Sequence, residues 1–303
     1  MSFTVTILGS GSAIPTAGRG LTAQFVVCRG RFILIDCGEG TQMQIRRFGI
    51  KFQRIEHVLI SHLHGDHYFG LVGLLSSMHL MGRKRAIQIY GPKGLKEIVE
   101  LQLNYDGARL AFELCFHETR PEGEQILFED EKMSIHSFPL AHRVPTTGFL
   151  IREKAREYHL LVEAAQRDQV PIAFYHRLKK GEDIALEDGS VLPFKKYTRP
   201  AALPKTYAFC SDTAFREAIA DYVKGADVLY HEATFTEQHK ERAKTTMHST
   251  AKQAAQLAQL AQVKRLVMGH LSARYDSGEG HEAEARKVFP SSEMAVDGLT
   301  FTV

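Results

Sequence analysis

The sequence of 303 residues contains no tryptophan and only four cysteines, at positions 28, 37, 115 and 210. These cysteines form no C-x-x-C pair, so we expect scattered small apolar side chains in a reducing, cytoplasmic compartment. No stretch approaches the roughly 20 apolar residues needed to cross a bilayer. The first residues also lack the basic region followed by an apolar one that marks a signal peptide. We therefore expect neither a membrane-spanning nor an exported protein.

A strong charge of one sign is also missing. With 38 Lys and Arg against 35 Asp and Glu, the net charge is +3, which permits an anionic partner but does not argue for one. Heptads, short repeats and low-complexity tracts are absent too. The length suggests one large or two small domains. What the chain does contain is an alternation of short apolar runs with helical stretches, which is typical of an α/β protein.

Several segments predict individual elements. "FTVTILGSGS" is expected to be a strand that runs into a Gly/Ser loop. "AQFVVCRGRFILIDCGEG" predicts a hairpin that turns near Arg29-Gly30. "LVGLLSSMHLMG" and "HSTAKQAAQLAQLAQ" predict helices, the second with a Ser or Thr as N-cap. Residues 152–200 are rich in charge and contain no long buried run, so we interpret them as an insertion that projects from one domain spanning 1–303.

Five separate apolar runs each end in a histidine or an aspartate. These residues are His62, His142, Asp212, His231 and His270. Because functional sites of α/β proteins form where strands end at one edge of a sheet, the five are candidates for a common site. Each of them taken alone would more often be an ordinary loop residue.

The first strand end carries an unusual concentration of ligand-type side chains. "SHLHGDHYFG" (61–70) places His62, His64, Asp66 and His67 within six positions. Histidine and carboxylate side chains bind borderline and hard cations. We expect His62 and His64 to point one way and Asp66 and His67 the other, each pair holding one of two metals. Such metals lie about 3.5–4 Å apart and share a bridging water. Four residues cannot complete two coordination shells, so the sequence predicts further ligands at distant strand ends.

This H-x-H-x-D-H spacing, followed by a lone His, a lone Asp and a final His, resembles the metallo-β-lactamase superfamily over nearly the whole chain. Narrower motifs resemble its ribonuclease Z family of transfer-RNA 3′-processing endonucleases. They are "LGSGSAIPT", "LIDCGEGTQMQIRR", "HEATF" (231–235), "HST" (248–250), "PTTGFLI" and "RLKKGEDIALEDGSVL". The resemblance implies an αββα sandwich of two mixed sheets flanked by helices, with a projecting arm.

The resemblance also implies roles for single residues. One zinc would take His62, His64 and His142, the other Asp66, His67 and His270, and Asp212 would bridge them; manganese is a possible substitute. The reaction would be hydrolysis of an RNA phosphodiester that leaves a 3′ hydroxyl. Asp66 would accept a proton, and His248, oriented by Glu232, would donate one to the leaving 3′ oxygen. Asp36 is expected to hold a ligand histidine rather than a metal, and direct participation of His231 is left open.

The arm within 152–200 implies a partner. By resemblance it grips a transfer-RNA precursor, and family members are generally homodimers. Lys179, Lys180, Lys195 and Lys196 could neutralise phosphates, and Tyr197 could stack on a base; the alternative is a solvated charged face. Two other functions stay open. One is a hydrolase of small phosphodiesters or other esters on the same fold, and the other is an RNA-binding module that has lost its metals.

Overall fold

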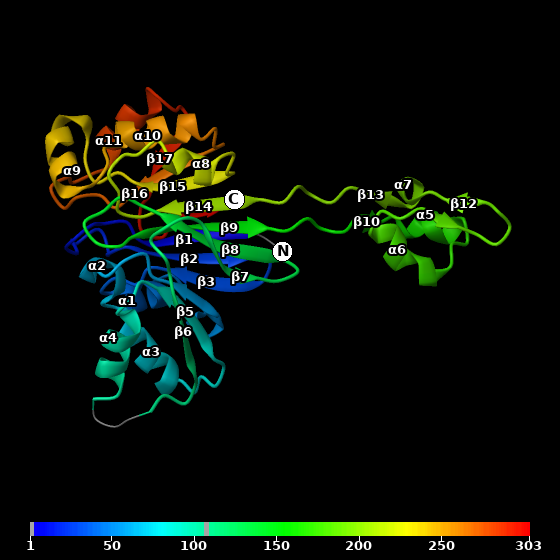
Figure 1. Ribbon diagram of the computed structural model, residues 1–303, viewed down its shortest axis with the longest axis horizontal. Helices are drawn as coiled ribbons and strands as arrows, with labels where there is room; N and C mark the ends of the chain where they lie inside the picture. The colour runs from blue at the N-terminus through cyan, green and yellow to red at the C-terminus, as the bar shows by residue number, and fades with distance from the viewer. Residues whose placement is uncertain (1–2, 106–108) are drawn as a thin grey trace. The chain divides into compact units, whose positions relative to one another are not determined.

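The computed structural model describes residues 3–105 and 109–303 (Figure 1). The chain divides into two compact units. The larger consists of Met1–Arg152 together with Lys205–Val303, and the smaller is Glu153–Pro204. The first unit contains the two large sheets and the site described below.

The first sheet of the larger unit has the strand order β18-β1-β2-β3-β4-β5-β6. The pairs β18-β1, β1-β2 and β2-β3 are antiparallel, and β3 to β6 are parallel to one another. The bounds are β1 Phe3–Gly9, β2 Ala23–Cys28, β3 Arg31–Ile35, β4 His57–Leu59, β5 Ile87–Gly91, β6 Leu114–Glu118 and β18 Thr300–Thr302. The predicted hairpin is confirmed, because Arg29 and Gly30 join β2 to β3 with φ values of 53° and 88°, the left-handed pair that a two-residue turn requires.

The second sheet has the order β17-β16-β15-β14-β9-β8-β7. Strands β14 to β17 are parallel, while β9 pairs antiparallel with β14 and β7 with β8. The bounds are β7 Gln125–Glu129, β8 Met133–Pro139, β9 Thr147–Glu153, β14 Thr206–Cys210, β15 Val228–Glu232, β16 Leu266–Gly269 and β17 Ser292–Met294. Both sheets are therefore mixed, as predicted.

Helices cover the outer face of each sheet in the larger unit (Figure 1). Beside the first sheet lie α1 Thr41–Arg47, η1 Phe52–Arg54, α2 Gly65–Tyr68, α3 Leu71–Leu80 and α4 Leu95–Leu103. Beside the second lie α8 Ile219–Val223, η3 Glu237–His239, α9 Lys240–Thr246, α10 Ala251–Leu260 and α11 Glu279–Arg286. The N-cap prediction is confirmed for α10, where Thr250 and Gln253 form a reciprocal capping box.

Three apolar cores hold these layers together. The first lies between the sheets and joins residues of both, for example Ile7, Phe149 and Phe209. The second packs the first sheet against α1, α3 and α4, and the third packs the second sheet against α8, α10 and α11. This four-layer order confirms the predicted αββα sandwich. Among the helices of residues 3–105 and 109–303, none combines the length and the apolarity that a membrane crossing requires.

The smaller unit, Glu153–Pro204, has a core of its own. Buried side chains of Ala165, Val170, Leu178, Ile184 and Tyr197 form it. Its elements are β10 His159–Leu160, α5 Val162–Arg167, η2 Ile172–Phe174, α6 Tyr175–Lys179, β11 Ile184–Ala185, β12 Val191–Leu192, α7 Phe194–Tyr197 and β13 Thr198–Arg199. The side chain of Tyr197 is only 2% exposed. The prediction that Tyr197 stacks on a base is therefore wrong, because its ring is needed for this core.

Candidate metal centre

Strand ends of both sheets meet at one cavity. His62 follows β4, His142 follows β8, Asp212 follows β14 and His270 follows β16 directly. His64 precedes α2, the one-turn helix that carries Asp66 and His67. Because β14, β15 and β16 are parallel, their carboxyl ends lie at the same edge, where α/β folds place their sites. The cavity has a volume of about 570 Å³, and its lining includes His64, Asp66, His142, Asp212, His248 and His270.

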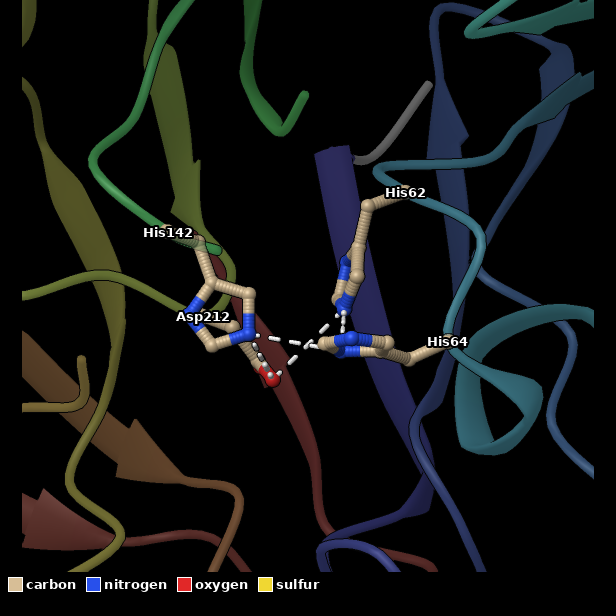
Figure 2. Close-up of side chains that lie close together, drawn as sticks. All are labelled: His62, His64, His142 and Asp212. Carbon is tan, nitrogen blue, oxygen red and sulfur yellow. Dashed lines mark hydrogen bonds and ion pairs between the residues drawn. The ribbon is translucent and has the colours of Figure 1, made fainter. Parts of the chain in front are cut away.

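The first group of donor atoms comes from His62, His64, His142 and Asp212 (Figure 2). His64 Nδ1 lies 3.0 Å from His62 Nε2 and 3.3 Å from His142 Nε2. Asp212 Oδ2 lies 3.6 Å from His62 Nε2 and 3.8 Å from His142 Nε2. All four donor atoms lie within 4.8 Å of one another, so they can surround a single cation.

The second group consists of Asp66, His67 and His270. Asp66 Oδ2 lies 3.5 Å from the Nε2 atoms of both histidines. The other oxygen of Asp212, Oδ1, lies 3.4 Å from His67 Nε2 and 3.1 Å from His270 Nε2. Asp212 therefore turns one oxygen to each group, as expected of a bridging carboxylate.

The donors are buried, and their charges are strongly coupled. Burial and the neighbouring His67 hold the pKa of His62 well below its ordinary value, which favours the neutral ring that binds metals. Burial opposes ionisation of Asp212, but His270 and His67 outweigh it and keep the Asp212 pKa well below its usual range. Burial likewise opposes the charge on Asp66, yet His67 and His270 lower its pKa. The aspartates thus remain ionised, as metal ligands must be.

Three histidine rings of the donor groups are each oriented by a hydrogen bond at Nδ1, the nitrogen that does not face the other donors. His67 Nδ1 lies 2.7 Å from Asp36 Oδ2, His142 Nδ1 lies 2.8 Å from Met247 O, and His270 Nδ1 lies 2.9 Å from Thr234 Oγ1. Against an acceptor such as the Met247 carbonyl, Nδ1 carries the proton and Nε2 keeps its lone pair free. Each ring therefore presents Nε2 to the cavity. Asp36 has the supporting position that the sequence suggested, and it also accepts hydrogen bonds from Ser61.

The donor set fits a pair of divalent cations. His67 Nε2, His270 Nε2 and Asp212 Oδ1 are buried, and none has a hydrogen-bond partner within the part of the chain that the structure describes. Buried polar atoms rarely stay unpaired, and these three face one another across the cavity. A cation that binds them would compensate the cost of burying them.

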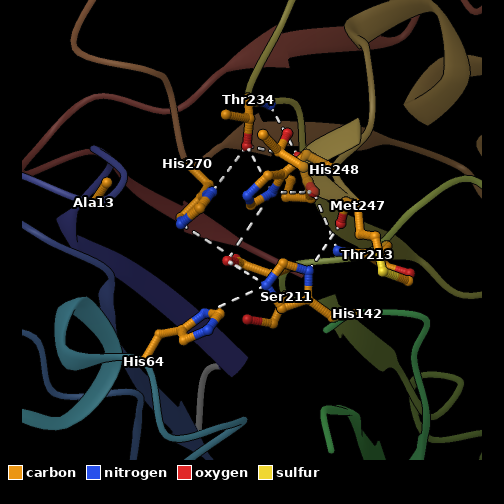
Figure 3. A network of polar contacts seen from close by, with 12 residues as sticks. Ala13, His64, His142, Ser211, Thr213, Thr234, Met247, His248 and His270 are labelled. Atoms are coloured by element: carbon orange, nitrogen blue, oxygen red, sulfur yellow. Dashed lines mark hydrogen bonds and ion pairs between the residues drawn. The ribbon is translucent and has the colours of Figure 1, made fainter. Parts of the chain in front are cut away.

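Beside the donor groups, His248 pairs with Glu232. His248 Nδ1 lies 2.8 Å from Glu232 Oε1 and 4.0 Å from Asp212 Oδ2. Figure 3 shows His248 among the polar contacts of this region. Burial disfavours a charged ring, but Glu232 outweighs it and raises the pKa of His248 to about 9. Glu232 itself is fully buried and accepts further bonds from Thr213, Thr234 and Ser249. The pair can hold a proton at the edge of the metal centre.

His231 does not reach the cavity. The strand β15 continues through Glu232, so His231 is a strand residue rather than a strand end. Successive side chains of a strand point to opposite faces, and Glu232 takes the face toward His248. His231 Nδ1 bonds instead to the Glu232 carbonyl oxygen at 2.6 Å. The run thus ends at His231-Glu232 as expected, and Glu232 rather than His231 is the residue that contacts His248.

Sequence reasoning missed one backbone donor. The N–H of Ala13, in the Gly/Ser loop after β1, donates to Asp66 Oδ2 at 2.8 Å. Ala13 has φ 60°, in the left-handed region, which aims this N–H at the carboxylate. A backbone group leaves no signature in the residue types, so only the loop's Gly and Ser content hinted at an unusual path.

Asp36 offers a test of this supporting shell. We expect Asp36→Asn to weaken metal binding about 10- to 100-fold, because His67 loses the carboxylate that fixes its ring. Competition with a chromophoric chelator measures this affinity. Asp130→Asn is a matched control, since Asp130 accepts from backbone N–H groups and Arg31 far from the cavity. Equal affinities in wild type and Asp36→Asn would contradict the orienting role.

Known proteins resemble this chain along its full length. Ribonuclease Z of Parabacteroides distasonis is 46% identical over 301 residues, which is 99% of both chains. Ribonuclease Z of Bacteroides thetaiotaomicron is 43% identical over 99% of this chain and 95% of its own. The chain belongs to the ribonuclease Z family. The resemblance noted from the motifs is thereby confirmed, and the ribonuclease Z assignment covers both compact units.

Solved structures and family models add to this comparison. The crystal structure of human tRNase Z, short form, matches with a TM-score of 0.72 and 28% identity, covering 98% of each chain. The metallo-beta-lactamase fold protein YhfI from Bacillus subtilis shares the fold, with a TM-score of 0.70 at 18% identity over both full chains. Residues 3–162 also belong to the family described as Anti-Pycsar protein Apyc1, and residues 202–271 match the Beta-lactamase superfamily domain.

Proposed function

We infer that this chain is a metal-dependent endoribonuclease that removes the 3′ trailer from transfer-RNA precursors. The observation that carries this inference is the complete His/Asp donor set of a ribonuclease Z family member, gathered in one cavity with Asp212 between the two groups. The test is cleavage of an end-labelled precursor that carries a 3′ trailer. We expect a single cut at the trailer boundary. This cut should be lost when a chelator removes the metal ions.

We propose two zinc ions as the resident metals, with manganese as a substitute. His62, His64 and His142 would hold one ion, Asp66, His67 and His270 the other, and Asp212 both. When bound, such ions polarise a phosphate and activate a water as nucleophile. The ordinary preference of mixed nitrogen and oxygen donors supports zinc.

The chain's own residues would handle the protons. Asp66 would accept a proton, and its hydrogen bond from the Ala13 N–H supports this role. His248 would give a proton to the leaving 3′ oxygen, and its contact with Glu232, which favours a charged ring, supports this role. This assignment leaves a 3′ hydroxyl on the transfer RNA and a 5′ phosphate on the trailer.

We propose that the smaller unit, Glu153–Pro204, binds the RNA substrate. Of its four candidate lysines, Lys179 is paired with Glu157 at 2.9 Å and Lys196 with Asp168 at 2.7 Å. Lys180 and Lys195 are exposed and form no ion pair within the described residues. These two lysines are therefore the better candidates for phosphate contacts, because no carboxylate competes for them.

Removal of the smaller unit tests this role. Arg152 and Thr206 are register partners in β9 and β14, so a short glycine-containing turn can replace 154–204 without moving either strand. We expect a large rise in KM for the precursor and unchanged hydrolysis of bis-p-nitrophenyl phosphate. The narrower deletion of 160–195 should act in the same direction. An equal loss on both substrates would instead assign the unit a role in folding.

We further propose a cytoplasmic homodimer. Four cysteines without a disulfide partner in the described chain fit a reducing compartment. The dimer is supported by family resemblance alone, and sedimentation should give the mass of two chains; the mass of one chain would reject it.

The main alternative is hydrolysis of small phosphodiesters or other esters at the same site. This alternative is retained because residues 3–162 match a family outside ribonuclease Z. Precursor cleavage separates the two, since a small-ester hydrolase would bind metals yet leave the RNA intact. A metal-free binding module is disfavoured by the complete donor set.

A further inference from the structure

Two of the three arginines that line the cavity lie on or bond to the segment around His248. Arg143, Arg242 and Thr246 line the cavity together with His248, and we call these residues the His248 side. The Asp66 side is lined by Ala13, Ile14, Glu39, Gly65, Asp66 and Phe69. In Figure 3, Ala13 and Met247 lie on opposite sides of the histidine cluster. The lining of the Asp66 side thus offers carboxylate and apolar groups but no Lys or Arg.

Arg143 and Arg242 are linked through helix α9. Arg143 directly follows His142, and its Nη2 donates to the carbonyl oxygen of Thr245 at 2.8 Å. Arg242 lies one turn earlier in α9, where its own carbonyl accepts from Thr246 Oγ1 at 2.8 Å. The chain then turns through Met247 into His248, whose N–H donates to Ala243 O. Both arginines are therefore tied to the same short segment as His248.

Neither guanidinium is neutralised. Both side chains are exposed at the cavity, and neither forms an ion pair with a carboxylate in residues 3–105 or 109–303. The third arginine of the cavity, Arg274, is also exposed and without an ion pair in the described residues, but it lies over the Phe235 ring and bonds to Ser272 rather than to the His248 segment. Two unpaired arginines beside an RNA-cleaving site are suited to bidentate binding of a phosphate.

We propose that Arg143 and Arg242 bind the phosphate on the 5′ side of the last nucleotide of the mature transfer RNA. The inference rests on the proposed function. If His248 protonates the leaving 3′ oxygen, the nucleotide that carries this oxygen must lie on the His248 side. Its own 5′ phosphate then continues along that side, where the two arginines are. The trailer leaves past the Asp66 side, which offers no basic group to hold it.

The test compares R143A/R242A with wild type on three substrates: a precursor with a one-nucleotide trailer, a precursor with a long trailer, and bis-p-nitrophenyl phosphate. We expect KM to rise about tenfold on both precursors, because a charged hydrogen-bonding contact is lost, with kcat within about twofold. The salt dependence of precursor binding should become shallower by about one phosphate contact. The small diester, which has no flanking phosphate, should be hydrolysed as by wild type.

R85A is the matched control. Arg85 is exposed, forms no ion pair in the described chain and precedes β5, at the opposite edge of the sheet from the cavity. The R85A substitution removes one positive charge without touching the site, so the KM of this variant for both precursors should stay at the wild-type value. The single variant R242A, on the surface of α9, leaves the Arg143–Thr245 hydrogen bond intact. A rise in KM for R242A therefore cannot come from the loss of that bond.

Three results would overturn the assignment. A loss confined to the long-trailer precursor would place the arginines on the trailer. An equal loss on the small diester would place them on the scissile phosphate. An unchanged KM on all substrates would remove them from binding altogether. Failure of the proposed function is distinct from these, because wild type itself would then leave both precursors uncut.

Discussion

Replacing Asp212 with alanine is expected to release both metals and to abolish activity. Its two oxygens face the two donor groups, Oδ2 toward His62 and His142 and Oδ1 toward His67 and His270. Each group therefore loses a charged ligand; the first group keeps no carboxylate, and the second keeps only Asp66. Metals supply several kcal/mol of transition-state stabilisation, so we expect turnover to fall about 10³-fold or more.

The measurement combines metal content of the purified variant with precursor cleavage. Asp227→Asn is the control, since Asp227 is also a buried carboxylate of the same sheet but binds Lys205, Lys264 and the Thr206 N–H. That variant should keep its metals and its activity. Retention of both metals and full turnover in Asp212→Ala would refute the bridging role.

A second large effect is expected for His248→Ala. Its Nδ1 is 2.8 Å from Glu232 Oε1, which leaves Nε2 available to a substrate in the cavity. Loss of a positioned general acid costs about 10²- to 10⁴-fold in rate. We expect kcat on the precursor to fall in this range. The metal content should stay unchanged, because both donor groups described above form without His248.

The substrate comparison decides whether the loss is one of proton donation. A p-nitrophenolate leaving group needs no proton, so hydrolysis of bis-p-nitrophenyl phosphate should fall far less than precursor cleavage. His239→Gln is a matched control: its ring bonds to Tyr275 and does not line the cavity. Equal losses on both substrates would show that His248 acts in binding or folding rather than as the acid.

The grouping of the donor side chains could be predicted from sequence because it follows from local geometry. His62 and His64 come before the one-turn helix α2, while Asp66 and His67 lie within it, so a change of backbone direction separates the two pairs. The distant members could be predicted because parallel strands align their carboxyl ends, which brings Asp212 and His270 to the same edge. The α/β class followed from the alternation of strands and helices, whereas the αββα order was implied by the resemblance to the metallo-β-lactamase superfamily.

Other features depend on information that residue types do not carry. The Met247 carbonyl and the Ala13 N–H fix His142 and Asp66, and backbone groups are the same at every position. The pleat of β15 decides whether His231 or Glu232 turns toward His248, and the apolar run preceding them is the same in either case. Tyr197 was a candidate for stacking on RNA because it lies beside Lys195 and Lys196 in a charge-rich segment, whereas the small core of Glu153–Pro204 requires its ring.

The most direct test of the account is cleavage of an end-labelled transfer-RNA precursor with a 3′ trailer, with metal content measured on the same preparation. We expect two metals per chain and a single cut near the last nucleotide of the mature transfer RNA. The cut should disappear on chelation and return with zinc or manganese. Two bound metals with an intact precursor would contradict the RNA-processing function and leave a small-ester hydrolase on the same fold.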